Sequence, residues 1–86
     1  MCECLKFKPY RKKDINWTGI DDDFTAIIKL INITYTLRVE QMDVNNWWAC
    51  FYINNSQEWV NDIQLKTEKQ AKTEVLRALN KHCARV

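Results

Sequence analysis

Apolar and polar side chains alternate from residue 33 to residue 40, in a run that extends to residue 42. One side of this run carries Ile33, Tyr35, Leu37 and Val39, and the other side carries Thr34, Thr36, Arg38 and Glu40. A period of two residues is the signature of a half-buried strand, and branched and aromatic side chains favour the same conformation. The pattern therefore predicts a strand with one face in a hydrophobic core and one polar face.

Shorter patterns predict further strands at residues 5–10, 15–18, 24–31 and 47–53. Residues 24–31 also fit a helical stripe that Asp23 would cap. Three isoleucines in this segment favour a strand, because branched side chains lose rotamer freedom in a helix. Residues 58–65 fit either another strand or an irregular connection.

Loops and turns are expected between these runs, at residues 11–14, 19–23, 43–46 and 54–56. The chain has a single glycine, so few turns can be built on glycine. Two of the predicted loops contain an Asn-Asn pair instead, and Asn tolerates the left-handed backbone conformations that hairpin turns need.

Residues 67–84 predict an amphipathic helix. Thr67 and Gln70 form a capping box, in which the Thr67 side chain accepts from a backbone N–H and Gln70 reaches back to the cap. The apolar stripe consists of Ala71, Val75, Ala78, Leu79 and Cys83, with Leu76 beside it. Its spacing is typical of a helix that buries one face.

The chain of 86 residues is therefore expected to form one domain of the α+β class. The predicted architecture is an antiparallel meander of about four to five strands, packed by one C-terminal amphipathic helix. A single helix covers only one face of a sheet, which leaves the other face to solvent, to loops or to a partner.

The strand at residues 47–53 is apolar on both faces. Trp47, Ala49, Phe51 and Ile53 form one face, which we expect under the helix, and Trp48, Cys50 and Tyr52 form the other. The second face would meet polar residues across the hairpin, and exposed aromatics beside an arginine are typical of interface hot spots. The predicted contact surface for a protein partner is Trp48, Tyr52, Arg38 and Trp59. The alternative is that Trp48 packs under residues 6–13 and that Tyr52 exposes only its hydroxyl group, which would make both residues core.

A second kind of partner is suggested by charge. The formal net charge is only +2, but residues 66–86 carry six basic and two acidic side chains. The helix could therefore follow a phosphate backbone, with Glu68 and Glu74 interrupting the basic surface. The candidate nucleic-acid contacts are Lys66, Lys69, Lys72, Arg77, Lys81 and Arg85. Self-association through a sheet edge, giving a homodimer, is a third possibility.

Residues that could carry catalysis or bind a metal are few. Cys2 and Cys4 are too close together for the usual zinc loop, and His82 and Cys83 are adjacent on a helix. The acidic run at residues 21–23 lacks the twelve-residue loop of a calcium site. No nucleophile elbow, phosphate loop or zinc-protease motif is present. We expect a non-enzyme with no cofactor and no metal.

The expected compartment is the cytoplasm. The first residues lack the apolar stretch of a signal peptide, and no apolar run approaches the ~18 residues of a membrane span. The four cysteines are then expected to be reduced thiols.

The order of elements resembles small phage and prophage proteins built as a β-meander capped by a C-terminal helix. The resemblance rests on Leu5-Lys6-Phe7, Trp17, Phe24-Thr25-Ala26, Tyr35-Thr36-Leu37, Trp47-Trp48 and the helix start Lys66-Thr67-Glu68-Lys69-Gln70-Ala71-Lys72. Gln70 stands where an acidic residue is common, and the usual turn glycines are missing. The resemblance implies an accessory protein that binds a host protein complex and blocks it stoichiometrically, as anti-CRISPR and anti-restriction proteins do. It implies no site residues.

Overall fold

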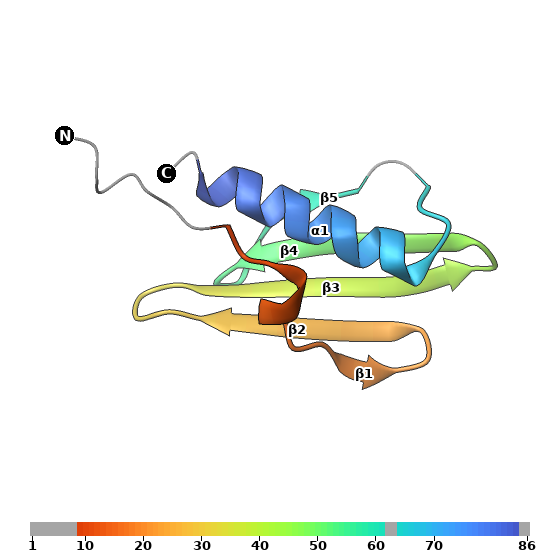
Figure 1. Ribbon diagram of the computed structural model, residues 1–86, viewed down its shortest axis with the longest axis horizontal. Coiled ribbons are helices and arrows are strands. Elements are labelled where there is room, and N and C mark those ends of the chain that lie inside the picture. The colour runs from red at the N-terminus through yellow and green to blue at the C-terminus, as the bar shows by residue number, and fades with distance from the viewer. Residues whose placement is uncertain (1–8, 62–63, 85–86) are drawn as a thin grey trace.

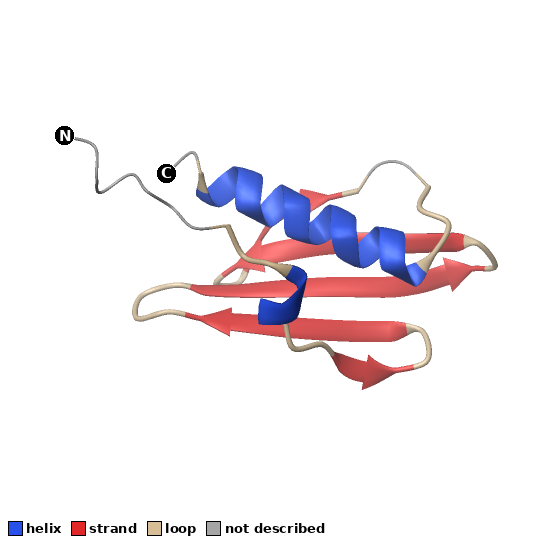
Figure 2. Ribbon diagram, viewed as in Figure 1, coloured by secondary structure: helices blue, strands red, loops and turns tan. Residues whose placement is uncertain are grey.

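The computed structural model describes residues 9–61 and 64–84, and it confirms the predicted α+β fold with a meander sheet and one C-terminal helix (Figure 1). The elements are a 3-10 turn η2 (Lys12–Asp14), the strands β1 (Thr18–Ile20), β2 (Asp23–Lys29), β3 (Thr34–Asp43), β4 (Asn46–Ile53) and β5 (Ser56–Val60), and the helix α1 (Glu68–Cys83). The strands form one antiparallel sheet in the order β1-β2-β3-β4-β5. Helix α1 crosses one face of the sheet above β3 and β4, and η2 lies on the same side (Figure 2).

Short hairpin turns connect β1 to β2, β3 to β4 and β4 to β5. Each has one residue in the left-handed region: Asp21 with φ 53°, Asn45 with φ 55° and Asn54 with φ 56°. The expectation that the Asn pairs build turns is confirmed for Asn45 and Asn54. Asn and Asp suit these positions because their short polar side chains lower the penalty of a positive φ.

The hydrophobic core lies between α1 and the sheet. The prediction that Trp47, Ala49, Phe51 and Ile53 face the helix is confirmed, because the first three are buried and Ile53 packs against them. The alternating side chains Tyr35, Leu37 and Val39 of β3 are buried beside them, as predicted. The helix contributes Ala71, Val75, Leu76, Leu79 and Cys83. Ile33, expected on the same side as Tyr35, instead lies in the β2–β3 loop and is partly exposed.

The helix begins as predicted at the cap residue Thr67, whose hydroxyl accepts a hydrogen bond from the Gln70 backbone N–H at 3.1 Å. The Gln70 side chain accepts from the backbone N–H of Lys66 at 2.9 Å, one residue before the cap. The expected bond back to Thr67 is thus shifted by one residue, but it still satisfies a backbone donor at the entry to the helix.

The N-terminal part of the chain differs most from the prediction. Residues 5–8 of the strand predicted at 5–10 lie outside the described residues, and Pro9 and Tyr10 have no regular structure. The loop expected at 11–14 is a 3-10 turn. The strand expected at 15–18 begins only at Thr18, because Ile15 and Trp17 pack against the core instead of pairing with β2.

Gly19, expected in a turn, is the central residue of β1. Its φ of 140° belongs to the region that favours glycine, and a Cβ there would lie 2.0 Å from the Asp23 carbonyl oxygen. The missing side chain is what allows β1 to approach β2 so closely.

Strand β5 begins at Ser56 and ends at Val60, earlier than the strand or irregular connection expected at 58–65. Beyond it, Leu65 is buried and forms an isolated bridge with Trp47, and residues 62–63 lie outside the described part. No helix among the described residues is long and apolar enough to cross a membrane.

Candidate binding surfaces

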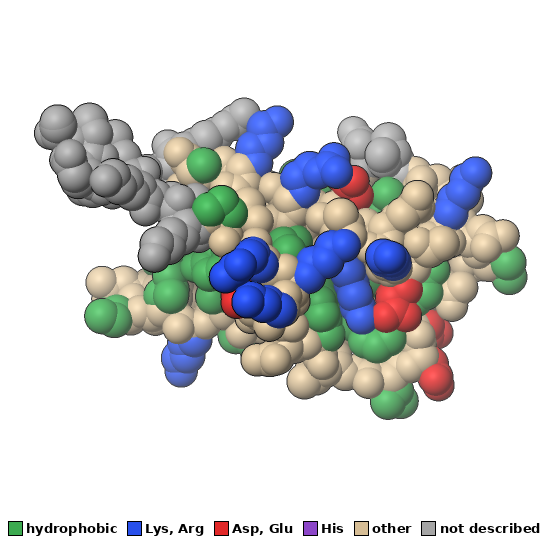
Figure 3. Space-filling model, viewed as in Figure 1, with side chains coloured by type: hydrophobic (Ala, Val, Ile, Leu, Met, Phe, Trp, Pro, Cys, Tyr) green, Lys and Arg blue, Asp and Glu red, His purple; other side chains and the backbone are tan. Residues whose placement is uncertain are grey.

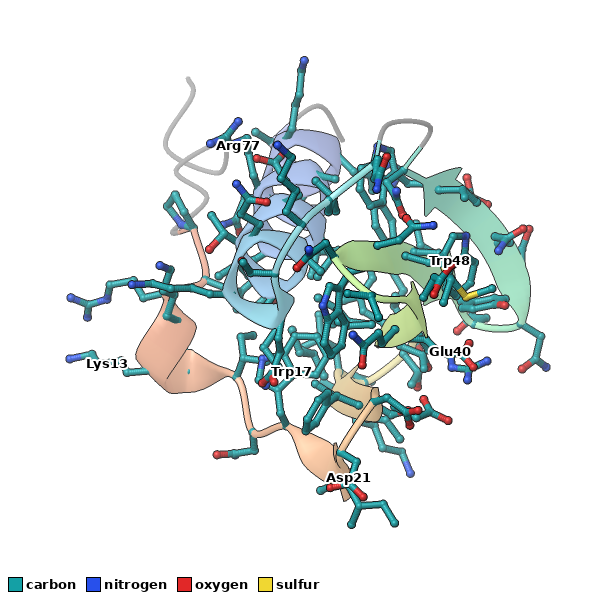
Figure 4. All side chains as sticks on the ribbon, turned by 90° about the vertical axis from the view of Figure 1, so that its right-hand side faces the viewer. Lys13, Trp17, Asp21, Glu40, Trp48 and Arg77 are labelled. Atoms are coloured by element: carbon teal, nitrogen blue, oxygen red, sulfur yellow. The ribbon has the colours of Figure 1, made fainter. Side chains whose placement is uncertain are left out.

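The face of the sheet opposite α1, hereafter the open face, is covered by none of the helices and strands that the structure describes. The strand register places the side chains of this face in three rows that run across the strands. The first row is Ile20, Asp23, Glu40 and Trp48, and the second is Thr18, Thr25, Arg38, Cys50 and Val60. The third row is Ile27, Thr36, Tyr52 and Gln57. Figure 4 shows Trp48 and Glu40 on this side of the sheet, away from the helix. Three predicted contact residues, Trp48, Tyr52 and Arg38, therefore lie together around one point of the open face.

Cys50 lies at the centre of this group, and its side chain is fully buried although no helix covers it. Its neighbours close over it: Tyr52 and Gln57 form hydrogen bonds with the thiol, and Arg38 and Glu40 lie near it. Burial raises the pKa of the Cys50 thiol, despite those hydrogen bonds and the Arg38 charge. A thiol that is buried and protonated is a poor nucleophile, so Cys50 supports the surface structurally.

The aromatic side chains of the open face are half-buried. Trp48 and Tyr52 have intermediate exposure, whereas Ile27 in the row of Tyr52 is 63 % exposed and Ile20 in the row of Trp48 is 76 % exposed. Arg38 is held by an ion pair with Asp23 at 3.3 Å, with side-chain exposures of 35 % and 49 %. The surface therefore presents fixed aromatic and charged groups beside exposed isoleucines.

Trp59, the fourth predicted contact residue, lies on the opposite face. It pairs with Phe51 in the register and stacks on that ring with centroids 6.2 Å apart. The cause is a β-bulge: Tyr52 pairs with Gln57 and Phe51 with Trp59, so Glu58 is an extra residue in β5. If pairing continued regularly from the β4–β5 turn, Trp59 would lie opposite Cys50 on the open face. The extra residue shifts the register by one, and a shift of one residue moves the following side chains to the other face of the sheet.

Charge is divided between the two layers of the molecule. Residues 9–17 and 64–84, which form the layer over the sheet, carry eight basic and three acidic side chains. Residues 18–60, which form the sheet and its turns, carry two basic and six acidic side chains. Figure 3 shows Lys and Arg side chains gathered over α1 and η2 on this face.

The predicted basic contacts on the helix are not equivalent. Lys66, Lys69 and Lys81 are exposed, and Arg77 pairs with Glu74 at 3.3 Å. Lys72 instead points toward the sheet, because it shares a helix face with Leu76 and Leu79. Its ammonium group lies 2.5 Å from Glu68 and 4.0 Å from the centre of the Phe24 ring. Arg85 lies outside the described residues.

A cleft of about 480 Å³ opens between η2 and the first half of α1. Ile15, Trp17 and Leu76 provide apolar lining, and Lys12, Lys69 and Lys72 provide positive charge. Thr67, Glu68 and Thr73 complete the lining. The sequence analysis predicted no binding role for Lys12, Ile15 or Trp17. Nothing in the local pattern shows that residues 9–17 fold back onto a helix some fifty residues later.

One pair of hydrogen bonds fixes the chain on that side. The Asn80 side chain accepts from the Tyr10 backbone N–H at 2.8 Å and donates to the Tyr10 carbonyl at 2.9 Å. Asn80 thus pairs with the chain as a neighbouring strand would, and it anchors the segment that leads into η2.

The described residues that were considered for metal binding or catalysis are not grouped at one site. Cys2 and Cys4 lie outside the described residues, and within the described part no three His, Cys, Asp or Glu side chains are placed to hold a metal ion. His82 is half-buried, and the centroid of its ring lies 5.9 Å from that of Phe51. Cys83 is buried in the core, as its place on the apolar stripe predicts, and both Cys50 and Cys83 are free thiols.

Comparison of the chain with protein-family models, with curated proteins and with solved structures found no match.

Proposed function

We propose that this protein is a non-catalytic binding protein that docks a protein partner on the open face of its sheet. The observation that carries the proposal is the grouping of Trp48, Tyr52 and Arg38 around the buried Cys50, on a face that no described element covers. Fixed aromatic and arginine side chains supply contact area at a low entropic cost and are enriched in interface hot spots.

The chemistry of the open face indicates what the partner presents. The sheet and its turns carry six acidic and two basic side chains, and Ile20 and Ile27 stand exposed among them. A complementary surface would combine apolar side chains with lysine or arginine. The same excess of acidic groups makes a phosphate backbone a poor partner for this face.

The proposed mode of action is stoichiometric inhibition. The protein would act by occupying a surface of its target, without any chemical step. The resemblance to small phage proteins suggests a cytoplasmic host complex, such as a CRISPR-Cas defence system, as the target class, and this part of the proposal rests on that resemblance.

The test is an affinity capture from a bacterial lysate that is divided in two, with nuclease added to one half. We expect a protein that is retained by the wild type with or without nuclease, and that is lost with Ile27→Glu. The matched control is Lys81→Glu, which also places a new carboxylate on an exposed side chain but on the helix layer. Retention by Ile27→Glu together with loss by Lys81→Glu would reject the open face as the binding surface.

A second candidate function is nucleic-acid binding by the helix layer, favoured by the excess of basic side chains over α1 and η2. The exposed contacts would be Lys66, Lys69 and Lys81, whereas Lys72 is already engaged by Glu68. Binding should then weaken with salt, because each neutralised phosphate releases a counterion. Lys69→Glu combined with Lys81→Glu should abolish it, and a salt-independent complex would exclude it.

A further inference from the structure

We infer that the cleft between η2 and α1 is a nucleotide site, which takes a planar base against its apolar lining and a phosphate on its lysines. The inference is independent of the open-face proposal and deepens the second candidate function, since it assigns one position on the basic layer where a nucleotide would be held. A free nucleotide and the terminal nucleotide of a single strand present the same chemistry to such a cleft.

The apolar part of the cleft suits a flat ring. Ile15 and Leu76 are 8 % and 7 % exposed, and the half-buried Trp17 ring stands beside them. Figure 4 shows Trp17 on the side of the sheet that carries α1. Aromatic side chains are the usual platforms on which bases stack, since every base has a π face.

Lys72 makes a cation–π interaction with the Trp17 ring. Its ammonium nitrogen lies 5.3 Å from the centre of the Trp17 ring and 4.0 Å from that of Phe24. It also bonds to Glu68 at 2.5 Å, so the one carboxylate that lines the cleft is already neutralised within the protein. Lys72 therefore contributes to the shape of the site more than to its charge.

Two lysines remain to bind an anion. Lys12 on η2 and Lys69 on α1 both line the cleft, and both are exposed with no ion pair to any residue in the described part of the chain. They come from different elements, on the two sides of the opening. The cleft therefore carries an uncompensated charge that favours a phosphate, next to a lining that favours a base.

The volume agrees with this class of ligand. About 480 Å³ falls within the ~300–1,000 Å³ of small-molecule and cofactor sites. The Thr67 oxygen accepts the helix-cap hydrogen bond but keeps its O–H donor, so the hydroxyls of Thr67 and Thr73 are the neutral polar groups for the sugar or the base edge.

The experiment is a nuclear magnetic resonance titration of the full chain, read at the four tryptophan indole N–H signals, with the Trp17 signal assigned by Trp17→Phe. The probes are adenosine monophosphate, adenosine and a short deoxyadenosine oligomer at low salt. We expect adenosine monophosphate to shift the Trp17 signal and backbone signals of residues 69–76, and adenosine to do so more weakly. Lys12→Gln with Lys69→Gln should weaken the monophosphate about tenfold and leave adenosine unchanged.

The matched control is Lys13→Gln with Lys29→Gln, which removes the same charge from exposed lysines outside the cleft and should change the affinity less than about twofold. An unmoved Trp17 signal, or equal weakening by both double variants, would overturn the inference. If the oligomer binds with a steep salt dependence while Trp17 stays unmoved, the helix layer still binds nucleic acid and only the cleft assignment fails. If both the oligomer and the monophosphate shift the Trp17 signal, the cleft also takes the terminal nucleotide of a single-stranded nucleic acid. If only the monophosphate shifts it, the ligand is a free nucleotide.

Discussion

Replacing Asn80 with alanine removes both hydrogen bonds that hold the chain around Tyr10 against α1. A hydrogen bond contributes about 0.5–1.5 kcal/mol net to folding, so the pair contributes about 1–3 kcal/mol. Alanine is the better helix former by roughly 0.5–0.7 kcal/mol, which offsets part of the loss. We expect Asn80→Ala to lower the free energy of unfolding by about 1–2 kcal/mol.

The assay is urea unfolding followed by tryptophan fluorescence, together with the indole signal of Trp17. Because residues 9–17 are anchored at Tyr10, the Trp17 signal should broaden or shift in Asn80→Ala. The matched control is Asn16→Ala, which makes the same chemical change at an exposed side chain of that segment and should alter stability by less than ~0.5 kcal/mol. An Asn80→Ala protein with wild-type stability and an unchanged Trp17 signal would refute the proposed anchoring role.

Three further predictions concern the strands. Gly19→Ala should destabilise the protein by about 1–3 kcal/mol and remove hydrogen-exchange protection in β1, because a Cβ would meet the Asp23 carbonyl oxygen. The hydrogen bond with Cys83 and burial raise the pKa of Tyr35 to about 12. Stability should therefore be intact below the unfolded-state pKa of about 10 and fall as the pH rises from about 10 to 12; Tyr35→Phe should flatten that fall. Cys50 is buried and should react with iodoacetamide far more slowly than a thiol in the unfolded chain. Trp48→Ala should speed the alkylation of Cys50 at least about tenfold and affect that of Cys83 less, as measured for each cysteine-containing peptide by mass spectrometry.

The central part of the fold was predictable because its pattern and its local chemistry agree. The alternation through Leu37 and the capping residue Thr67 mark β3 and the start of α1, and Asn45 and Asn54 mark two turns. In each case the residues of one short stretch of sequence are enough to predict the element. The assignment of the two faces of β4 followed, since one face matches the apolar side of β3.

The features that escaped prediction depend on contacts between distant segments. The bulge at Glu58 reverses the direction of Trp59, and no rule of alternation reveals an inserted residue. The packing of Ile15 and Trp17 depends on α1 far along the chain. Lys72 is the exception: its spacing from Leu76 and Leu79 already places it on the buried side of the helix, so a stricter count along the helix would have separated it from the exposed lysines.

Binding of a protein partner on the open face is tested most directly by site-specific photo-crosslinking. The photo-reactive amino acid p-benzoylphenylalanine would replace Ile27 on the open face in one protein and Lys81 on the helix layer in another. After irradiation in nuclease-treated lysate, we predict a discrete protein adduct from position 27 and none from position 81. An adduct from position 81 with none from position 27 would contradict the account and move the binding surface to the helix layer.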